Sequence, residues 1–456
     1  MSPRAPIDLA TPIEKAFLLA VDTGEDPGWT AEESIDELAA LATTAGADVV
    51  GAEWQNRRHV DPNWYVGKGK AEELLQAKSE TGFDILIADD ELSPGQQKAL
   101  EGLLKVKVID RSRLILDIFA QHAQTHEGRL QVELAQLEYQ LPRLTRMWTH
   151  LSRTQGGIGS RGPGESQLET DRRIIRERIK KMKERVENVR QQRETAARGR
   201  DRRLFATVAI VGYTNAGKST LLNSLVGSEV ARAEDKLFAT LDPTSRQVKL
   251  GDGQTAIVTD TVGFIHKLPH QLVDAFRATL EEVTRADALL EIVDASDRHF
   301  EEHRATVQTV LEELGAGDKP RLVAFNKADL LMDAADARNG HGAAPSVAGA
   351  VLVSALTGFG LDTLRDEIAA VLASLWQDVD IAVPYTAGEL LARVRERGTV
   401  DVEYRDRDVR VRGRMAPSLA GELEAVARRW AATLAEEAGT PDRDDVAAAG
   451  RERPAH

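Results

Sequence analysis

The sequence predicts an α/β protein built around a doubly wound sheet. Strand and helix patterns alternate along residues 15–125 and again along 201–376, and a glycine-rich loop joins a strand to a helix at Gly212–Lys218. Alternating strands and helices build parallel sheets covered by helices. We expect a small parallel α/β domain over 15–125, a long antiparallel helical hairpin over 126–200, the doubly wound domain over 201–376 and a small α+β module over 377–437, between a flexible terminus (1–14) and a disordered tail (438–456).

The composition excludes several classes of protein. The chain has 456 residues, too many for one ordinary core. Zero cysteine excludes disulfides, thiol catalysis and cysteine-based zinc sites. The sequence has no run of about eighteen apolar residues and no charged-then-apolar leader. We therefore expect a soluble, cytoplasmic protein of several domains with no stable membrane insertion.

Positive charge is concentrated in one part of an acidic chain. The formal net charge is −14, yet residues 143–203 carry 18 Lys and Arg against 8 Asp and Glu. A local basic block indicates a polyanionic partner better than the overall charge does, because phosphate contacts are local. The block therefore predicts a nucleic-acid contact, and the alternative is a solvated charged helix.

The first domain is predicted from alternating patterns. A Thr30-x-x-Glu33 capping box opens one helix, and Ser93 begins another. The turn Gly67-Lys-Gly-Lys70 either touches phosphate or, as we favour, carries two solvated lysines. Strands are expected at residues 17–21, 48–54, 84–88 and 106–110, with a further helix at 71–77.

Two apolar patterns predict the helical hairpin. Their residues recur at steps of three and four, the spacing of a coiled pair. Pro142 falls inside the first pattern and should kink that helix. The tip at residues 155–166, with five glycines and a proline, is either a disordered connector or, as we favour, a binding tip that orders on its target. The apolar positions are Leu130, Leu134, Leu137, Leu141, Leu144, Trp148 and Leu151, then Leu168, Ile175, Ile179, Met182, Val186 and Val189.

A phosphate-binding loop follows the buried strand that ends at Val211. Gly212 and Gly217 let the backbone turn tightly around an anion, so that N–H groups point at it beside a helix N-terminus. Lys218 adds a charge for the terminal phosphates, and the Ser219 hydroxyl is placed to ligate Mg²⁺. The predicted phosphate contacts are Gly212, Tyr213, Thr214, Asn215, Ala216, Gly217, Lys218, Ser219 and Thr220.

An acidic turn downstream completes the phosphate end of the site. Asp260-Thr261-Val262-Gly263 directly follows an expected strand. A carboxylate at that strand end holds Mg²⁺ through water, and the Gly263 N–H can meet a γ-phosphate. The strands expected in this domain are residues 204–211, 247–250, 255–259, 288–293, 321–325 and 350–353.

A second motif selects the base. Asn326-Lys327-Ala328-Asp329 follows an apolar strand. The Asp329 carboxylate can accept hydrogen bonds from N1–H and the 2-amino group of guanine, and adenine has neither donor. The Lys327 stem can lie over the base plane. The segment Ser354-Ala355-Leu356 can donate a backbone N–H to guanine O6. The ordered motifs therefore predict a GTP-hydrolysing domain.

The segment Phe238-Ala239-Thr240-Leu241-Asp242 lies between the first helix of this domain and the acidic turn. A threonine hydroxyl there would complete the Mg²⁺ shell and let the loop sense the γ-phosphate. Thr240 and Thr244 both qualify on spacing.

Two residues bear on catalysis. Many GTPases place a glutamine after the glycine of the acidic turn to orient the attacking water, but this chain has Phe264. Intrinsic hydrolysis should therefore be slow unless a partner or a monovalent cation compensates. Asn215 stands where potassium-dependent GTPases place a ligand asparagine; otherwise it caps the loop.

Four stretches together resemble the HflX family of ribosome-associated GTPases, within the translation-factor-related class. They are Gln155–Arg173, Leu237–Asp242, Asp260–Phe264 and Arg129–Leu137, and the resemblance covers about residues 15–376. It implies Thr240 as the switch threonine, an N-terminal domain and hairpin that dock on the large ribosomal subunit, and a glycine-rich tip that reaches toward the peptidyl-transferase region. The candidate rRNA contacts are Gly156, Gly157, Arg161, Arg172, Arg173 and Arg176.

The resemblance also implies a function. Members split stalled or stress-inactivated ribosomes in the GTP-bound state, and some use ATP through the N-terminal part. We expect a monomer off the ribosome. Two alternatives remain open, an RNA-remodelling enzyme driven by nucleotide hydrolysis and a GTP-regulated scaffold without a ribosomal role. The module at 377–437 carries no chemistry that the sequence reveals.

Overall fold

A computed structural model describes residues 13–25, 28–144, 163–198, 205–227, 237–238, 240–251, 254–268, 280–331 and 349–438. The predicted terminus before residue 13, most of the hairpin tip, Trp148, Leu151, Ala239 and the tail after residue 438 lie outside these ranges. The chain divides into two compact units, the first containing residues 1–197, 207–248 and 257–364, the second the remainder. The predicted α/β fold class is confirmed.

The N-terminal module, β1 to α4, is a parallel four-stranded sheet in the order β2-β1-β3-β4. Alternate residues of β1 enter two different cores: Leu18 packs on one face of the sheet and Leu19 on the other. Apolar side chains on both faces bury residues 16–21 of this strand. The elements are β1 Lys15–Asp22, α1 Ala31–Thr44, β2 Asp48–Asn56, α2 Lys68–Thr81, β3 Ile85–Ala88, α3 Pro94–Leu104, β4 Lys107–Asp110 and α4 Arg111–His122.

Local signals begin these helices where the sequence predicts. Thr30 and Glu33 form the reciprocal capping box of α1. Ser93 caps α3 in the same way, with Gln96 as its partner. The Lys68–Lys70 turn forms the first turn of α2, and Lys70 Nζ lies 2.7 Å from a Glu53 carboxylate oxygen. That lysine is therefore neutralised by its own module.

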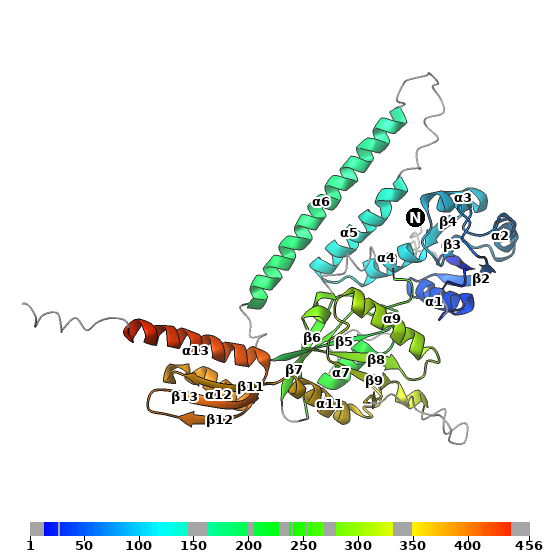
Figure 1. The fold of residues 1–456 in the computed structure, drawn as a ribbon. Helices are drawn as coiled ribbons and strands as arrows, with labels where there is room; N and C mark the ends of the chain where they lie inside the picture. The colour runs from blue at the N-terminus through cyan, green and yellow to red at the C-terminus, as the bar shows by residue number, and fades with distance from the viewer. Residues whose placement is uncertain are drawn as a thin grey trace, which may run out of the picture. The chain divides into compact units, whose positions relative to one another are not determined.

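The hairpin consists of α5, His126–Arg143, and α6, Pro163–Arg198, which run beside each other (Figure 1). The predicted seam is confirmed in part: Leu130, Leu134 and Leu137 form one core with Ile179 and Met182. Pro142 lies inside α5, in its last turn, as the sequence predicts. The kink expected there stays a prediction: proline has no N–H for the helical ladder and crowds the preceding turn.

The nucleotide module, β5 to α11, is a six-stranded sheet in the order β10-β9-β8-β5-β7-β6. The three strand pairs from β10 to β5 are parallel. All six strands overlap the predicted ranges. The described elements are β5 Ala206–Gly212, α7 Lys218–Val226, β6 Thr244–Lys249, β7 Thr255–Asp260, β8 Ala288–Asp294, α9 Phe300–Glu313, β9 Arg321–Asn326, β10 Val351–Leu352 and α11 Leu361–Ser374.

The C-terminal module lies in the second unit. Its antiparallel sheet has the order β11-β13-β12, and its last two strands form a hairpin. Val379, Ile381 and Val383 recur at every second residue along its first strand. The elements are β11 Gln377–Val383, the 3₁₀ helix η3 Tyr385–Ala387, α12 Gly388–Arg397, β12 Thr399–Tyr404, β13 Val409–Met415 and α13 Pro417–Ala438.

Within the described ranges, no helix combines the length and the apolar character that a membrane crossing requires.

Candidate nucleotide site

The phosphate loop leaves the end of β5 and enters α7, as the sequence predicts. Two of its glycines are required by space. A Cβ on Gly212 would lie 2.3 Å from the Ile292 carbonyl oxygen, and one on Gly217 would lie 2.3 Å from Asn326 Nδ2. Both also have positive φ values, 150° and 88°. Any side chain at either position would displace the neighbouring strand or the base-binding segment.

The Lys218 side chain, at the start of α7, reaches back to the phosphate loop. It is 7 % exposed, and its Nζ donates to the Tyr213 carbonyl oxygen at 2.7 Å. Burial lowers the pKa of the Lys218 ammonium to about 8, against the opposing charge of Asp260. A Cβ on Gly263 would lie 2.8 Å from Lys218 Nζ, so the acidic turn also lies directly against the loop. Lys218 is thus held where the terminal phosphates of a nucleotide would neutralise it.

Three oxygen-bearing side chains converge beside the lysine. Ser219 Oγ donates to Asp260 Oδ2 at 2.6 Å and lies 2.7 Å from Thr240 Oγ1. Asp260 is fully buried, and its Oδ1 has no hydrogen-bond partner within the described structure. Burial raises the pKa of Asp260, against hydrogen bonds from Ser219 and the charge of Lys218.

These oxygens fit a magnesium ion. Mg²⁺ prefers hard oxygen ligands and usually takes only one or two from protein side chains, the rest coming from water and phosphate. Ser219 and Thr240 would be its direct ligands, with Asp260 acting through water. Thr244 begins β6, and the observed cluster contains Thr240.

The base-binding segment is tied to the phosphate loop. Asn326 Nδ2 donates to the Ala216 carbonyl oxygen, and the Ala355 N–H donates to Asn326 Oδ1, each at 2.9 Å. Asn326 therefore joins three loops that are far apart in the sequence. The sequence suggested a role at the base for this motif but gave no signal for that bridge. The predicted bond from the 354–356 segment to guanine O6 stays a prediction. Within this segment, the Ala355 N–H is already bonded to Asn326.

Asp329 and Lys327 are each oriented by a neighbour. Asp329 Oδ1 accepts a 2.5 Å hydrogen bond from Ser354 Oγ, which fixes the carboxylate that the sequence assigns to guanine. Lys327 has a left-handed φ of 64°, and its Nζ lies 2.8 Å from Asp294 Oδ2. Leu356 is 79 % exposed and ends the segment at the surface.

Phe264 is a core residue. Its ring is 1 % exposed and packs under the sheet with Leu280 and Val283. Its backbone joins the acidic turn to the phosphate loop: the Phe264 N–H donates to the Gly212 carbonyl oxygen at 3.1 Å, and Thr214 donates to the Phe264 carbonyl oxygen at 2.8 Å. The side chain therefore has no role in orienting a water molecule.

The remaining predicted residues are distributed around this centre. Phe238 and Leu241 are buried, and the Phe238 ring meets Phe119 of α4 edge-on at 4.7 Å. Thr261 Oγ1 donates to the Ile210 carbonyl oxygen at 2.6 Å. Thr220 lies in α7, Val262 and Ala328 are buried, and Asn215 is exposed with a φ of 58°.

Some of the predicted rRNA contacts are described. Arg173 and Arg176 are exposed on α6, and Arg172 is partly exposed. Gly156, Gly157 and Arg161 lie outside the described residues.

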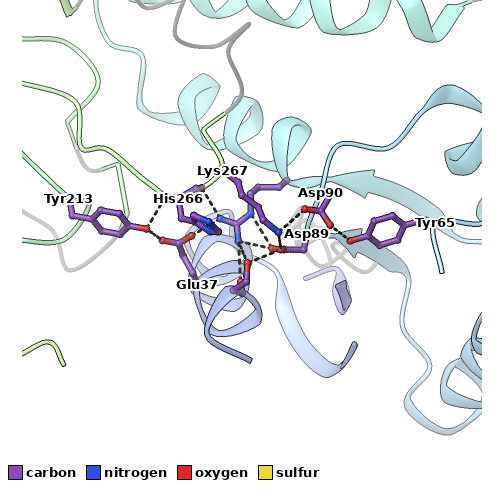
Figure 2. A network of polar contacts seen from close by, with 9 residues as sticks. Glu37, Tyr65, Asp89, Asp90, Tyr213, His266 and Lys267 are labelled. Atoms are coloured by element: carbon purple, nitrogen blue, oxygen red, sulfur yellow. Dashed lines mark hydrogen bonds and ion pairs between the residues drawn. The ribbon is translucent and has the colours of Figure 1, made fainter. Parts of the chain in front are cut away.

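A buried ionic network, not predicted from the sequence, joins the N-terminal module to the segment after the acidic turn (Figure 2). Arg111, at the start of α4, lies 2.6 Å from Asp89 Oδ1 and donates to the His266 carbonyl oxygen at 3.1 Å. Lys267 Nζ reaches Asp89 Oδ2 at 2.5 Å and Asp90 Oδ1 at 2.6 Å. Asp89 is 1 % exposed, so its charge depends on these two cations.

Tyr213 extends this network into the phosphate loop. Its hydroxyl donates to a Glu37 carboxylate oxygen and accepts a 2.8 Å hydrogen bond from the His266 N–H (Figure 2). The Tyr213 ring stacks on His303 with ring centroids 3.8 Å apart. The phosphate loop is thus held from the side by residues of the N-terminal module.

The fold and this arrangement define a P-loop GTPase. Family models described as "GTP-binding GTPase N-terminal", "GTP-binding GTPase Middle Region" and "50S ribosome-binding GTPase" match residues 32–120, 122–200 and 207–327. The GTPase HflX of Caldanaerobacter subterraneus subsp. tengcongensis is 46% identical over 86% of this chain and 89% of its own length. The GTPase HflX of Escherichia coli is 43% identical over 82% and 88%.

This chain belongs to the HflX family of GTPases, and it binds and hydrolyses GTP. GTPases of this class use Mg²⁺. A solved structure, a GTP-binding protein from the archaeon Sulfolobus solfataricus in complex with GDP, is 25% identical with a TM-score of 0.40, covering 79% of this chain and 98% of that one.

Asp329→Asn should weaken GDP binding by about tenfold to a hundredfold, because an amide offers one acceptor and adds a donor where guanine presents donors. Xanthine nucleotides, which reverse that pattern at C2, should gain affinity relative to GDP. Titration with fluorescent nucleotides measures both, and Asp318→Asn, an exposed carboxylate of the same module, is the control. Unchanged GDP affinity would refute the assignment of Asp329.

Asp89→Asn should destabilise the protein by about 3–5 kcal/mol at pH 7, because the buried Arg111 and the partly exposed Lys267 lose their shared partner. Burial alone would raise the pKa of Asp89, but Arg111 and Lys267 outweigh it and hold the pKa at about 2. The stabilisation should be complete above the ordinary pKa and disappear as pH falls toward 2.

Urea unfolding of the wild type and Asp89→Asn at pH 7 and pH 2.5 tests this pH dependence. The difference between them should shrink at the lower pH. Asp84→Asn, an exposed carboxylate just before β3, should change neither curve. A stability difference that is equal at both pH values would contradict the proposed ionic origin.

Proposed function

We propose that this GTPase docks on the large ribosomal subunit and dissociates stalled or stress-inactivated ribosomes. The observation that carries the proposal is the helical hairpin. Its second helix, α6, exposes basic side chains, and the N-terminus of its first helix, α5, contacts Asp242 of the nucleotide-sensing segment, residues 238–242. The matched family model described as a 50S ribosome-binding GTPase and the HflX relatives agree with a ribosomal partner. The protein would act through the modules predicted from the sequence, with the hairpin at 126–200 and the GTPase domain at 201–376.

The basic face is suited to RNA. Residues 143–203 carry 18 Lys and Arg against 8 Asp and Glu. On the inner side, Lys183 Nζ lies 2.8 Å from a Glu138 carboxylate oxygen of α5, while Arg173 and Arg176 are exposed. Phosphate contacts from such side chains position a protein on RNA without reading its sequence. The glycine-rich tip would then reach the functional centre of the subunit.

The nucleotide acts as a timer in this proposal. Thr240 would hold Mg²⁺ and the Gly263 N–H would meet the γ-phosphate of GTP, which would order the segments 238–242 and 260–264 for ribosome binding. Mg²⁺ would neutralise charge on the phosphates. Hydrolysis then releases both segments. Because Phe264 is buried, the intrinsic rate is low, and the bound ribosome supplies the missing order at the site. ATP use is a secondary activity, and the free protein is a monomer.

Co-sedimentation with large ribosomal subunits tests the proposal. The protein should sediment with them in a non-hydrolysable GTP analogue and stay in solution with GDP. Failure to bind subunits in either state would leave a GTP-regulated scaffold as the better account. ATP-driven RNA unwinding that persists in Asp329→Asn would favour an RNA-remodelling enzyme.

Charge reversal of Arg173 and Arg176 to Glu should lower subunit affinity and make its dependence on salt shallower, by about one in the logarithmic slope for each phosphate that the protein no longer neutralises. Reversal of Arg428 and Arg429, exposed on α13, is the matched control. Equal affinities and slopes for both variants would show that the face of α6 is only solvated.

We also propose that Asn215 holds a potassium ion that stabilises the charge developing during hydrolysis. Asn215 belongs to the phosphate loop, and it is exposed with a left-handed φ of 58°. Replacing K⁺ by Na⁺ should slow single-turnover hydrolysis by about tenfold or more. Asn215→Ala should remove that difference, and equal rates in the two salts would contradict a potassium site.

A further inference from the structure

The Asp242 carboxylate caps the base of the hairpin. Asp242 Oδ2 accepts hydrogen bonds from the Gln124 N–H at 2.9 Å and the Thr125 N–H at 2.8 Å, and Oδ1 accepts one from Thr125 Oγ1. Thr125 is the N-cap residue of α5. The positive end of a helix dipole attracts a carboxylate, and amides before the first turn need acceptors. Asp242, a residue of the nucleotide-sensing segment, thus caps the N-terminus of α5, the first helix of the hairpin.

A glycine keeps this approach open. Gly128 lies in the first turn of α5, and a Cβ on it would come within 2.4 Å of Asp242 Oδ1. The next nearest atom, Thr125 Oγ1, would be 3.2 Å away. Glycine inside a helix costs about 0.5–1 kcal/mol relative to alanine. Its presence here has a local reason, which is access for Asp242.

The nucleotide-sensing segment also supplies one of the predicted metal ligands, Thr240. Thr240, two residues before Asp242, lies 2.7 Å from Ser219 Oγ. Leu241 between them is 2 % exposed and belongs to the core that holds Phe119 of α4 and Val132 of α5. Thr240 therefore cannot move far without moving the cap, because Leu241 fixes the short stretch of chain that joins them.

We propose that Asp242 is the positioning residue through which the bound nucleotide controls the hairpin. With GTP, Thr240 is held and Asp242 caps α5; with GDP, the segment relaxes and the cap is lost. The effect on ribosome binding rests on the function proposed above, but the coupling itself is a property of the free protein. Asp242 acts through α5 and touches no reacting atom.

Hydrogen–deuterium exchange of the free, full-length protein tests this coupling. Peptides covering residues 123–131 should exchange about fivefold more slowly with a saturating non-hydrolysable GTP analogue than with saturating GDP, the effect expected of an N-cap contact. Asp242→Asn should remove the difference between the two nucleotides.

Gly128→Ala tests the same contact from the other side. The added Cβ meets the end of a flexible carboxylate, so the side chain can move aside while alanine favours the helix. The variant should stay folded, with unchanged exchange in β8, and should lose the nucleotide-dependent difference. A mere loss of helix stability would speed exchange with both nucleotides and leave their ratio intact.

Two matched variants complete the design. Asp287 accepts hydrogen bonds from the Thr207 N–H at 2.7 Å and Thr207 Oγ1 at 2.8 Å, the same chemistry away from the nucleotide, so Asp287→Asn should preserve the difference. Gly102 in α3 has nothing within 4 Å of an added Cβ, so Gly102→Ala should also preserve it.

The proposal fails if the wild type exchanges equally with both nucleotides, or if Asp242→Asn and Gly128→Ala keep the wild-type ratio. Either result stands whether or not the protein sediments with ribosomal subunits. Conversely, a nucleotide-dependent cap in a protein that ignores ribosomes would uphold the coupling and refute only the proposed function.

Discussion

The position of the nucleotide site depends on one buried carboxylate. Asp89 lies at the end of β3 and is shared by Arg111 of its own module and Lys267 of the nucleotide module. A buried charge is tolerated only while it is paired, and removing one partner costs several kcal/mol. Separating these modules would remove Lys267 and leave Arg111 as the only ion-pair partner of Asp89 within the described residues. The two modules therefore form one electrostatic unit, and the phosphate loop is supported from outside its own sheet.

Much of the fold could be predicted because its causes are local. Alternation along β1 places Leu18 and Leu19 on opposite faces of the sheet. The capping box that begins α1 joins Thr30 to Glu33, its neighbour in the first turn. The size of a bend at Pro142 is not set locally, because it depends on the packing around the helix, which a single segment does not specify.

The site divides in the same way. Gly212, Lys218 and Asp329 could be predicted as contacts, because a phosphate or a base requires their chemistry at fixed places along the chain. Three contacts could not be predicted: the bridge made by Asn326, the ion pairs of Lys267 and the cap made by Asp242. Their partners are 110, 178 and 117 residues away. Each of these contacts is made by an ordinary polar residue, and nothing in the local sequence distinguishes it from a solvated one.

Tyr213 has a thermodynamic consequence. It belongs to the phosphate loop, yet its hydroxyl is bonded to Glu37 of α1 and to the backbone of His266. Coupling between two binding events is reciprocal: if the nucleotide changes how firmly the N-terminal module is held, then a load on that module must change nucleotide affinity by the same factor. The phosphate loop therefore also responds to the N-terminal module: a partner that pulls on this module changes the affinity of the loop for nucleotide.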